Sequence, residues 1–370
     1  MSKIKVLHMT PPIINNGIYK YIFSNLKFIN KEKFQFDFLT QNKSGLMETE
    51  EYDKYHFNIK GFSTTQRDDP QKFQYEIEQI LSDNYDVLQL HTSFWRGFAI
   101  EEIAMRLGIP KIIVHSHSTW IDKTSEKERN ELLQIHEEYK KKFSERYATH
   151  FWACSRKAAD WLYGEQVRPQ KVQIVPNAIE MDRFCYNLEK RNRMRKSLGI
   201  EDDVVIGHTG RFEYQKNHAF LIKVFAKVYK RNPNVKLLLI GEGELLPPIK
   251  LLVKDLQLED AVIFLEWRND VEDLLQAMDI YCLPSWFEGL PISLIEAQAS
   301  GLYCFVSEMV STEAKITENV EFLALEEELW FNRILELTNG YFRKDVSEQI
   351  AVAGYDIREQ IKVLETLYER

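Results

Sequence analysis

The stretch IYCLPSWFEGLPISLIEA, residues 280–297, contains the signals that decide the fold of the second half of the chain. Its apolar start, residues 280–283, is typical of the end of a buried strand, and Gly289 then breaks the strand. Pro291 is well placed as the first residue of a new helix. This order predicts a strand, a loop and a helix. Glu288 is expected in the loop and Glu296 about one turn into the helix.

The start of this helix is a candidate anion site, because the first backbone N–H groups of a helix have no partner within it. Carboxylates beside such a site pair well with sugar hydroxyls. The pattern therefore predicts a nucleotide-sugar site, with the diphosphate at the helix start, ribose on one glutamate and hexose near the other. The residues expected to line it are Glu288, Gly289, Leu290, Pro291, Ile292 and Glu296. Two alternatives stay open: Ser293 and Glu296 fit a capping box, and Glu288 fits a solvated loop acid.

Apolar runs without polar alternation recur along both halves of the chain, with amphipathic stretches between them. The expected strands are residues 4–9, 36–39, 87–90, 111–115 and 151–154, then 204–206, 235–240, 262–265, 280–283 and 303–306. Such runs are typical of parallel sheets covered by helices on both faces. We predict an α/β protein of two Rossmann-like, doubly wound domains that face each other across a ligand-binding cleft.

The boundary between the two domains is expected within residues 176–200, which contain a Pro-Asn turn signal and a strongly basic run. We predict an N-terminal acceptor-binding domain over residues 1–178 and a nucleotide-sugar-binding domain over 179–345. A C-terminal helix within 346–370 is expected to pack back on the N-terminal domain. The basic run, residues 190–196, fits either a solvated linker helix or a contact with anionic phospholipid.

Composition excludes several classes of protein. Apolar residues make up 44% and charged residues 28%, as in ordinary soluble proteins, and the net charge of −8 argues against a general nucleic-acid binder. No apolar run approaches the roughly 18–20 residues of a membrane span. Residues 1–8 are too short and polar for a signal peptide. The four cysteines lack metal-site spacing. We expect a cytoplasmic protein without metal or cofactor.

Two cations follow the predicted strand that begins at residue 204. Arg211 offers a planar fork for phosphate, and Lys216 offers a compact point charge. Such a pair would stabilise the charge that develops on a departing nucleoside diphosphate. The alternative from these residues alone is a pair of surface cations at a strand end.

Several segments together resemble the retaining glycosyltransferases of family four, which have the GT-B fold. Residues 287–297 resemble the nucleotide-sugar motif of that family. Further matches are VIGHTGRF (205–212) with Gln215-Lys216-Asn217 for the diphosphate loop, LLIGEG (238–243) for the next strand and turn, FLEWRNDV (264–271) for the base-binding loop and IVPNAI (174–179) for the domain junction. Within the family, the chain looks most like bacterial exopolysaccharide and capsule enzymes.

This resemblance implies roles for further residues that bind the donor. Arg211 and Lys216 fall on the family's cation positions, so no metal ion is required. Gly241 falls in the donor-binding turn, and backbone groups near Trp267 and Arg268 are expected to contact the base. The aromatic ring of Trp267 alternatively belongs to the core.

In the first half, Asn16 and Gly17 fall in a loop that approaches the diphosphate, where the family often has two glycines. His117 matches the family's histidine that contacts the donor sugar. His115 and His91 fit either a structural or a functional role. Asp122 is the nearest candidate for the base that an inverting enzyme would need.

The function implied is transfer, with retention, of a hexose or N-acetylhexosamine from a nucleotide-diphosphate sugar, taken to be UDP-linked, to a saccharide or lipid-linked saccharide acceptor. The setting would be the synthesis of exopolysaccharide, capsule or another surface glycan, with peripheral contact to the inner membrane face as an added expectation. The catalytic residues would be Arg211, Lys216, Glu288 and His117. Two alternatives remain: an inactive acceptor-binding or chaperone subunit of a glycosylation complex, and a sugar-nucleotide epimerase, which shares the fold.

Overall fold

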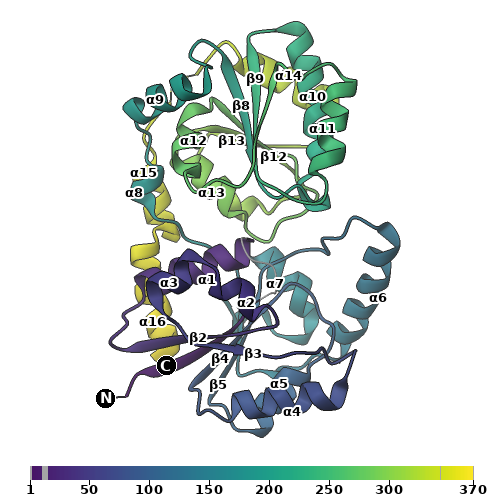
Figure 1. Ribbon diagram of the computed structural model, residues 1–370, viewed down its shortest axis with the longest axis vertical. Coiled ribbons are helices and arrows are strands. Elements are labelled where there is room, and N and C mark those ends of the chain that lie inside the picture. Colours follow the sequence, from purple (N-terminus) through teal and green to yellow (C-terminus); the bar gives the residue numbers. More distant parts are fainter. Residues whose placement is uncertain (1, 11–15, 342, 370) are drawn as a thin grey trace. The chain divides into compact units, whose positions relative to one another are not determined.

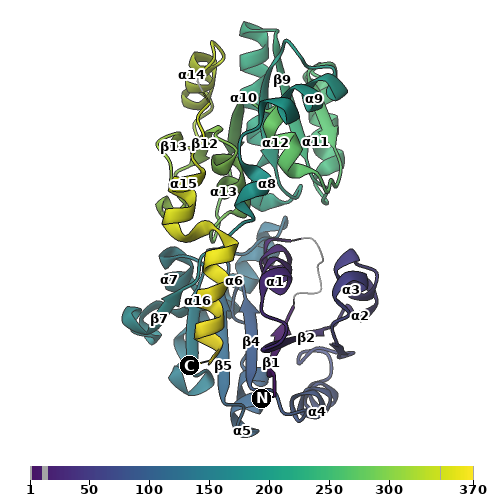
Figure 2. The ribbon, with the colours of Figure 1, turned by 90° about the vertical axis from the view of Figure 1, so that its left-hand side faces the viewer.

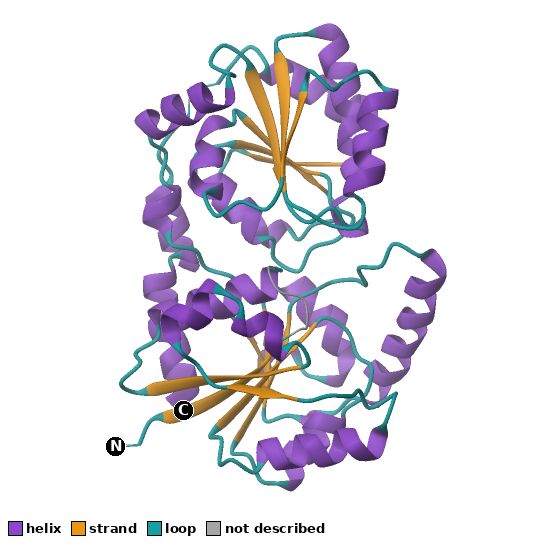
Figure 3. Cartoon of the chain, viewed as in Figure 1, coloured by secondary structure: helices purple, strands orange, loops and turns teal. Residues whose placement is uncertain are grey.

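The computed structural model describes residues 2–10, 16–341 and 343–369. The described residues fall into two compact units, each built on one sheet of parallel strands with helices packed around it (Figure 3). The first unit comprises Met1–Ile121, Lys127–Asn177 and Ile357–Arg370, and the second comprises Asp122–Glu126 and Ala178–Asp356. The predicted α/β class with two Rossmann-like domains is therefore confirmed.

The first unit has a seven-stranded sheet within the described residues, and all of its strand pairings are parallel. In spatial order the strands are β3 (Ile59–Gly61), β2 (Phe34–Thr40), β1 (Ile4–Met9), β4 (Val87–Thr92), β5 (Lys111–Ser116), β6 (His150–Ala153) and β7 (Val172–Ile174). The helices are α1 (Gly17–Phe28), α2 (Lys43–Met47), α3 (Glu50–Tyr55), α4 (Pro70–Leu81), α5 (Ala99–Arg106), α6 (Glu126–Lys142), α7 (Arg156–Tyr163) and α16 (Ile357–Glu369). Helices α4 and α5 lie on the face of the sheet opposite α1 (Figure 1).

The C-terminal helix α16 belongs to the first unit although it is the last element of the chain (Figure 2). Its residues Ile361, Leu364 and Tyr368 join the apolar core formed by β1, β2 and α1. The ammonium group of Lys111 donates to the carbonyl oxygens of Leu367 and Tyr368 at 2.8 and 2.9 Å. A buried cation at the helix C-terminus satisfies its last carbonyls and complements the helix dipole. Which unit binds acceptor and which binds donor stays a prediction.

The second unit has a six-stranded sheet within the described residues, again with parallel pairings. Its spatial order is β10 (Val262–Leu265), β9 (Val235–Ile240), β8 (Val204–Thr209), β11 (Ile280–Leu283), β12 (Tyr303–Ser307) and β13 (Val320–Leu323). The helices are α8 (Met181–Phe184), α9 (Leu188–Leu198), α10 (His218–Arg231), α11 (Leu246–Asp255), α12 (Val271–Ala277), α13 (Ile292–Ala299), α14 (Glu327–Leu337) and α15 (Ser347–Ile350). A buried cluster that includes Phe225, Phe305 and Trp330 fills the core.

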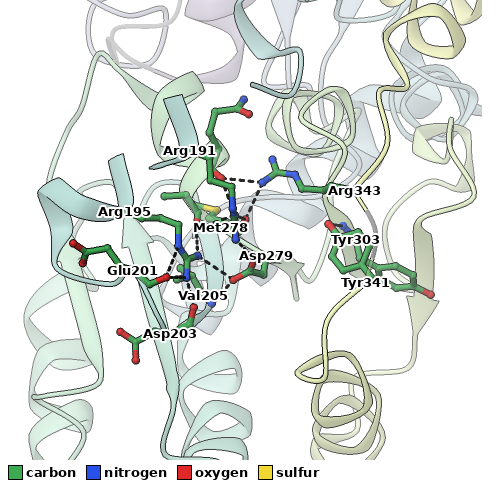
Figure 4. Close-up of polar contacts among 12 residues, drawn as sticks. Arg191, Arg195, Glu201, Asp203, Val205, Met278, Asp279, Tyr303, Tyr341 and Arg343 are labelled. Atoms are coloured by element: carbon green, nitrogen blue, oxygen red, sulfur yellow. Dashed lines mark hydrogen bonds and ion pairs between the residues drawn. The ribbon is translucent and has the colours of Figure 1, made fainter. Parts of the chain in front are cut away.

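The basic run on α9 does not form a solvated linker helix, contrary to one of the two interpretations of the sequence. Arg191 and Arg195 point into the second unit and both pair with Asp279, at 2.5 and 3.2 Å (Figure 4). Arg343 joins them by donating to the carbonyl oxygen of Met278 at 3.0 Å, which also accepts from Arg191 at 2.8 Å. These arginines satisfy carbonyl groups at the C-terminal end of α12 and hold α9 against it.

Candidate active site

The strand order of the second sheet reverses between β8 and β11, which are neighbours in space. In open parallel sheets, ligands bind beyond the carboxyl ends of the strands at such a reversal. Arg211 follows the end of β8, and Glu288 follows the end of β11. The two loops predicted to carry the nucleotide-sugar therefore meet at the position where the topology favours a ligand.

Glu288 is held firmly in this loop rather than solvated, so the loop-acid alternative is wrong. Its Oε1 lies 2.6 Å from the Nζ atom of Lys216 and accepts from the hydroxyl of Ser285 at 2.8 Å. Its Oε2 accepts from the amide of Gln215 at 3.0 Å. The side chains of Lys216 and Glu288 are only 14% and 7% exposed. Three donors thus fix the Glu288 carboxylate in one orientation.

Arg211 contacts two carboxylates in the same unit. Its guanidinium lies 3.1 Å from Asp122 and 3.6 Å from Glu213. The second oxygen of Asp122 accepts from the backbone N–H of Gln215 at 3.1 Å. Burial, the largest cause, raises the pKa of Glu213, and Asp122 adds to the rise while Arg211 opposes it. The two oxygens of the Asp122 carboxylate thus accept from a guanidinium and from a backbone N–H of the loop, the same donors that a phosphate would use.

Helix α13 begins at Ile292 with Pro291 in the N-cap position, and no side chain caps it. Ser293 therefore lies inside the helix rather than at its N-cap, and the capping-box interpretation of Ser293 and Glu296 is wrong. Glu296 is the fifth helical residue and is 5% exposed. The helix start, with its partial positive charge, follows the Glu288 loop directly.

Gly241 follows β9 with φ +138°, and a Cβ built there would lie 2.2 Å from the carbonyl oxygen of Gly210. Only glycine permits this approach. The backbone N–H of Gly210 donates to Ile240 at 3.0 Å, and that of Phe212 donates to Glu242 at 2.7 Å. The glycine therefore brings the turn after β9 against the loop that carries Arg211.

The residues predicted to contact the base lie on the surface of the second unit. Trp267 is 41% exposed, so its assignment to the core is wrong. Its backbone N–H donates to Glu242 at 3.3 Å, and its indole donates to Asn269 at 3.2 Å. Arg268 forms a two-point ion pair with Asp270 at 2.8 and 2.6 Å. The Arg268 side chain is thus engaged locally, as expected for a residue proposed to act through its backbone.

In the first unit, Asn16 and Gly17 form the start of α1. Asn16 is the N-cap, and its side chain accepts from the N–H of Tyr19 at 2.8 Å. A Cβ added to Gly17 would meet nothing within 4 Å. Among residues 2–10, 16–341 and 343–369, no contact requires glycine at this position.

His117 belongs to a cluster of histidines in the first unit. The Nδ1 atom of His91 lies 2.9 Å from Nε2 of His117, and Nε2 of His91 lies 3.1 Å from Nδ1 of His8. The rings of His115 and His117 are 4.0 Å apart. Burial lowers the pKa of His117 and His8 to about 3, so these imidazoles are neutral at pH 7. Sequence reasoning named three of the four but did not predict that they meet, and it missed His8.

A second pair of histidines, His208 and His218, was not predicted to be part of the site. His208 is the fifth residue of β8, and its Nδ1 bonds to the carbonyl of Cys282 at 2.7 Å. Burial lowers its pKa to about 3, and the charge of Lys216 adds to this effect. The ring of His218 stacks on Phe212 at 4.0 Å. The motif around Arg211 contained His208, and His218 directly follows it, but the burial of both residues depends on tertiary packing.

Two Rossmann-like domains of this kind, each with a reversal of strand order in its sheet, form the GT-B fold. The sequence profile of glycosyl transferases group 1 matches residues 190–330, and that of Glycosyltransferase Family 4 matches residues 15–183. The chain belongs to the family 4 glycosyltransferases.

Similar proteins of known sequence and structure agree with this assignment. The putative glycosyltransferase EpsF of Bacillus subtilis is 29% identical, over 99% of this chain and 97% of that protein. The Escherichia coli UDP-Gal:alpha-D-GlcNAc-diphosphoundecaprenol alpha-1,3-galactosyltransferase is 22% identical, over 99% and 97%. The crystal structure of Anabaena HepE in complex with UDP and glucose has a TM-score of 0.77 at 17% identity, over 98% and 99% of the two chains. Among the described residues, no helix is both long and apolar enough to cross a membrane.

Proposed function

We propose that the chain transfers a hexose or N-acetylhexosamine from a UDP-sugar to a saccharide or lipid-linked saccharide acceptor, with retention and without a metal ion. The product would be an exopolysaccharide, capsule or related surface glycan. The names of the relatives support this setting, since one is a galactosyltransferase acting on a diphosphoundecaprenol-linked sugar and another a capsular polysaccharide enzyme. The bound UDP and glucose of the HepE structure support the choice of donor.

The observation that carries the proposal is the grouping of Arg211, Lys216 and Glu288 where the strand order reverses between β8 and β11. Two cations beside the start of α13 suit a diphosphate. Glu296, buried on the same helix, would accept from the ribose hydroxyls, and Glu288 would orient the hexose. Arg211 and Lys216 would exchange their present carboxylate partners for phosphate oxygens when the donor binds.

In the proposed reaction, the bond between the anomeric carbon and the diphosphate oxygen breaks while the acceptor oxygen bonds to that carbon from the same face. The acceptor proton passes to the departing diphosphate oxygen. Arg211 and Lys216 stabilise the negative charge that grows on the diphosphate. His117, neutral at pH 7, would hydrogen-bond a hexose hydroxyl. Because the departing diphosphate takes the acceptor proton, this reaction does not use Asp122 as a base.

A thermal-shift screen of UDP-, GDP-, ADP- and TDP-sugars identifies the donor, because a ligand bound only by the folded state raises its stability. Glu296→Gln should weaken binding of the UDP-sugar by roughly ten- to a hundredfold, the value of a charge-assisted hydrogen bond of about 1.5–3 kcal/mol. The matched control is Glu259→Gln, at an exposed position before β10. Product NMR with an α-linked donor tests the stereochemistry. A β-linked product, with Asp122→Asn inactive, would refute retention.

A further inference from the structure

The histidine cluster of the first unit follows from the register of two central strands. Strands β4 and β5 are parallel neighbours in which His91 lies directly opposite His115. His117 comes two residues after His115, and alternate residues of an extended segment point to the same side of a sheet. The three imidazoles therefore gather on one side of the first sheet. The ring of Tyr21, on α1, packs against all three, with centroid distances of 5.2–5.9 Å.

We propose that His91, His115 and His117 form a binding site for a late first-row transition-metal ion, with Zn²⁺ the expected physiological occupant. One ring nitrogen from each residue lies within 4.8 Å of the others. A tetrahedral ion with Zn–N bonds of about 2.0–2.1 Å holds its ligands about 3.3–3.4 Å apart. The 2.9 Å separation of the His91 and His117 nitrogens is close to that value, and the His115 nitrogen lies within 4.8 Å of both, so its ring would have to move toward the ion.

A metal ion binds imidazole through a bare nitrogen, and His115 offers a candidate for it. The Nε2 atom of His115 is buried and has no hydrogen-bond partner among the described residues. A metal ion would supply the partner that this nitrogen lacks.

Two of the three ligands already have outer partners of the kind that orient metal-binding histidines. If His91 binds through Nδ1, its Nε2–H donates to Nδ1 of His8, 3.1 Å away. If His115 binds through Nε2, its Nδ1–H faces the side-chain amide of Gln89 at 3.2 Å, which presents its oxygen after an amide flip. His91 and His117 are partly exposed, which provides a path for the ion. With three protein ligands, the fourth position would be open to water.

Such a site favours zinc, cobalt, nickel or copper over magnesium, because imidazole is a ligand for these ions and Mg²⁺ prefers oxygen. It is therefore distinct from a catalytic Mg²⁺ and is compatible with metal-independent transfer. The proposal does not depend on the proposed transfer reaction, because metal binding is measured directly. If His117 does contact the donor sugar, Zn²⁺ would also inhibit transfer.

The test uses the full chain without an affinity tag, stripped with EDTA and titrated with Co²⁺, followed by equilibrium dialysis with Zn²⁺. We expect one equivalent of Co²⁺, the visible absorption of a four-coordinate ion, and its loss when Zn²⁺ displaces it. His91→Gln and His115→Gln should each weaken binding at least about a hundredfold, since loss of an outer partner alone costs about 10–100-fold. The control His150→Gln, at the start of β6 in the same sheet, should bind normally.

His117→Cys provides a second measurement that does not depend on the folding of the buried variants. A thiolate ligand should add a sulfur-to-cobalt charge-transfer band that the wild type lacks. Absence of stoichiometric binding to the wild type would overturn the proposal. So would equal weakening in His150→Gln, which would indicate adventitious surface binding, or a His117→Cys spectrum without the new band.

Discussion

The ion pair between Lys216 and Glu288 is expected to make a measurable net contribution to the stability of the second unit. Exposed ion pairs are worth about 0–1 kcal/mol. This pair is different because its atoms are 2.6 Å apart and its side chains are 14% and 7% exposed. A hydrogen bond between charged groups contributes about 1.5–3 kcal/mol. We expect less than the 3–5 kcal/mol typical of breaking a fully buried pair, because Ser285 and Gln215 still bond a glutamine at position 288.

A double-mutant cycle isolates this interaction from the other effects of each substitution. The variants are Lys216→Met, Glu288→Gln and the two combined, and the predicted coupling free energy is about 1.5–3 kcal/mol. Because a chain of two units need not unfold in one step, the measurement should be local. Amide hydrogen exchange in β8 and β11 reports opening of this region, and the coupling should appear as an excess of about 10–150-fold in exchange rate.

The result has a clear alternative. A coupling below about 0.5 kcal/mol would place the pair with ordinary exposed ion pairs and refute the argument from burial. Added salt provides a further check, because a buried pair is screened much less than an exposed one. If Glu288→Gln also binds UDP more tightly than the wild type does, Lys216 has become available to the diphosphate, as the exchange of partners proposed above requires.

Three further predictions concern other parts of the second unit and one control in the first. His208 has a pKa of about 3 when folded and 6.5 as its ordinary value, so the unfolded chain gains its proton first as the pH falls. The contribution of His208 to the free energy of unfolding is therefore constant above about pH 7 and is about 2 kcal/mol smaller at pH 5. In urea unfolding, His208→Asn should lose less stability between pH 7 and pH 5 than the wild type does. Gly241→Ala should lower the free energy of unfolding by more than about 1–3 kcal/mol, the cost of a strained backbone, because the added Cβ also meets a carbonyl oxygen. The control Gly17→Ala lies on a helix with no described atom near the added Cβ, so it should be neutral or stabilise by up to about 1 kcal/mol in thermal unfolding. Arg211→Ala should lower kcat more than it raises KM, and a raised KM at full kcat would mean that Arg211 only anchors the donor. EDTA should not lower the wild-type rate in a steady-state assay.

The central strands could be predicted from the sequence because each is a continuous apolar run with buried neighbours on both sides. The bounds of the central strands β9 and β11 agree with the predicted residues 235–240 and 280–283, and the edge strand β10, which is also an apolar run, agrees with the predicted residues 262–265. The edge strands β3, β7 and β13 were not predicted. The first two have three residues each, and the middle residues of β13 are only partly buried. A short strand with one neighbour does not need the apolar run that makes a central strand visible.

In the candidate site, the positions of residues along the strands could be predicted from the sequence, but their contacts with other loops could not. A strand that ends before a loop places Arg211 and Glu288 at the carboxyl edge of a sheet, so their neighbourhood could be predicted. Their partners could not, because the contacts of Gln215 and Asp122 depend on how separate loops approach one another. The basic run on α9 was misread for a related reason: its composition does not reveal that Arg191 and Arg195 point toward uncapped carbonyls.

The reversals of strand order in the two sheets carry different kinds of polar group, and the difference follows from the cost of burying charge. Beside β8 and β11, the cation Lys216 is paired with the carboxylate of Glu288. Beside β1 and β4, His8 is buried and His91 is partly buried, and desolvation lowers the pKa of both, so they are neutral at pH 7. Two cations beside a helix start suit an anionic group, so we predict that the diphosphate binds to the second unit. A neutral imidazole instead suits a sugar hydroxyl, with which it exchanges a single hydrogen bond. It also suits a metal ion, which needs a bare ring nitrogen.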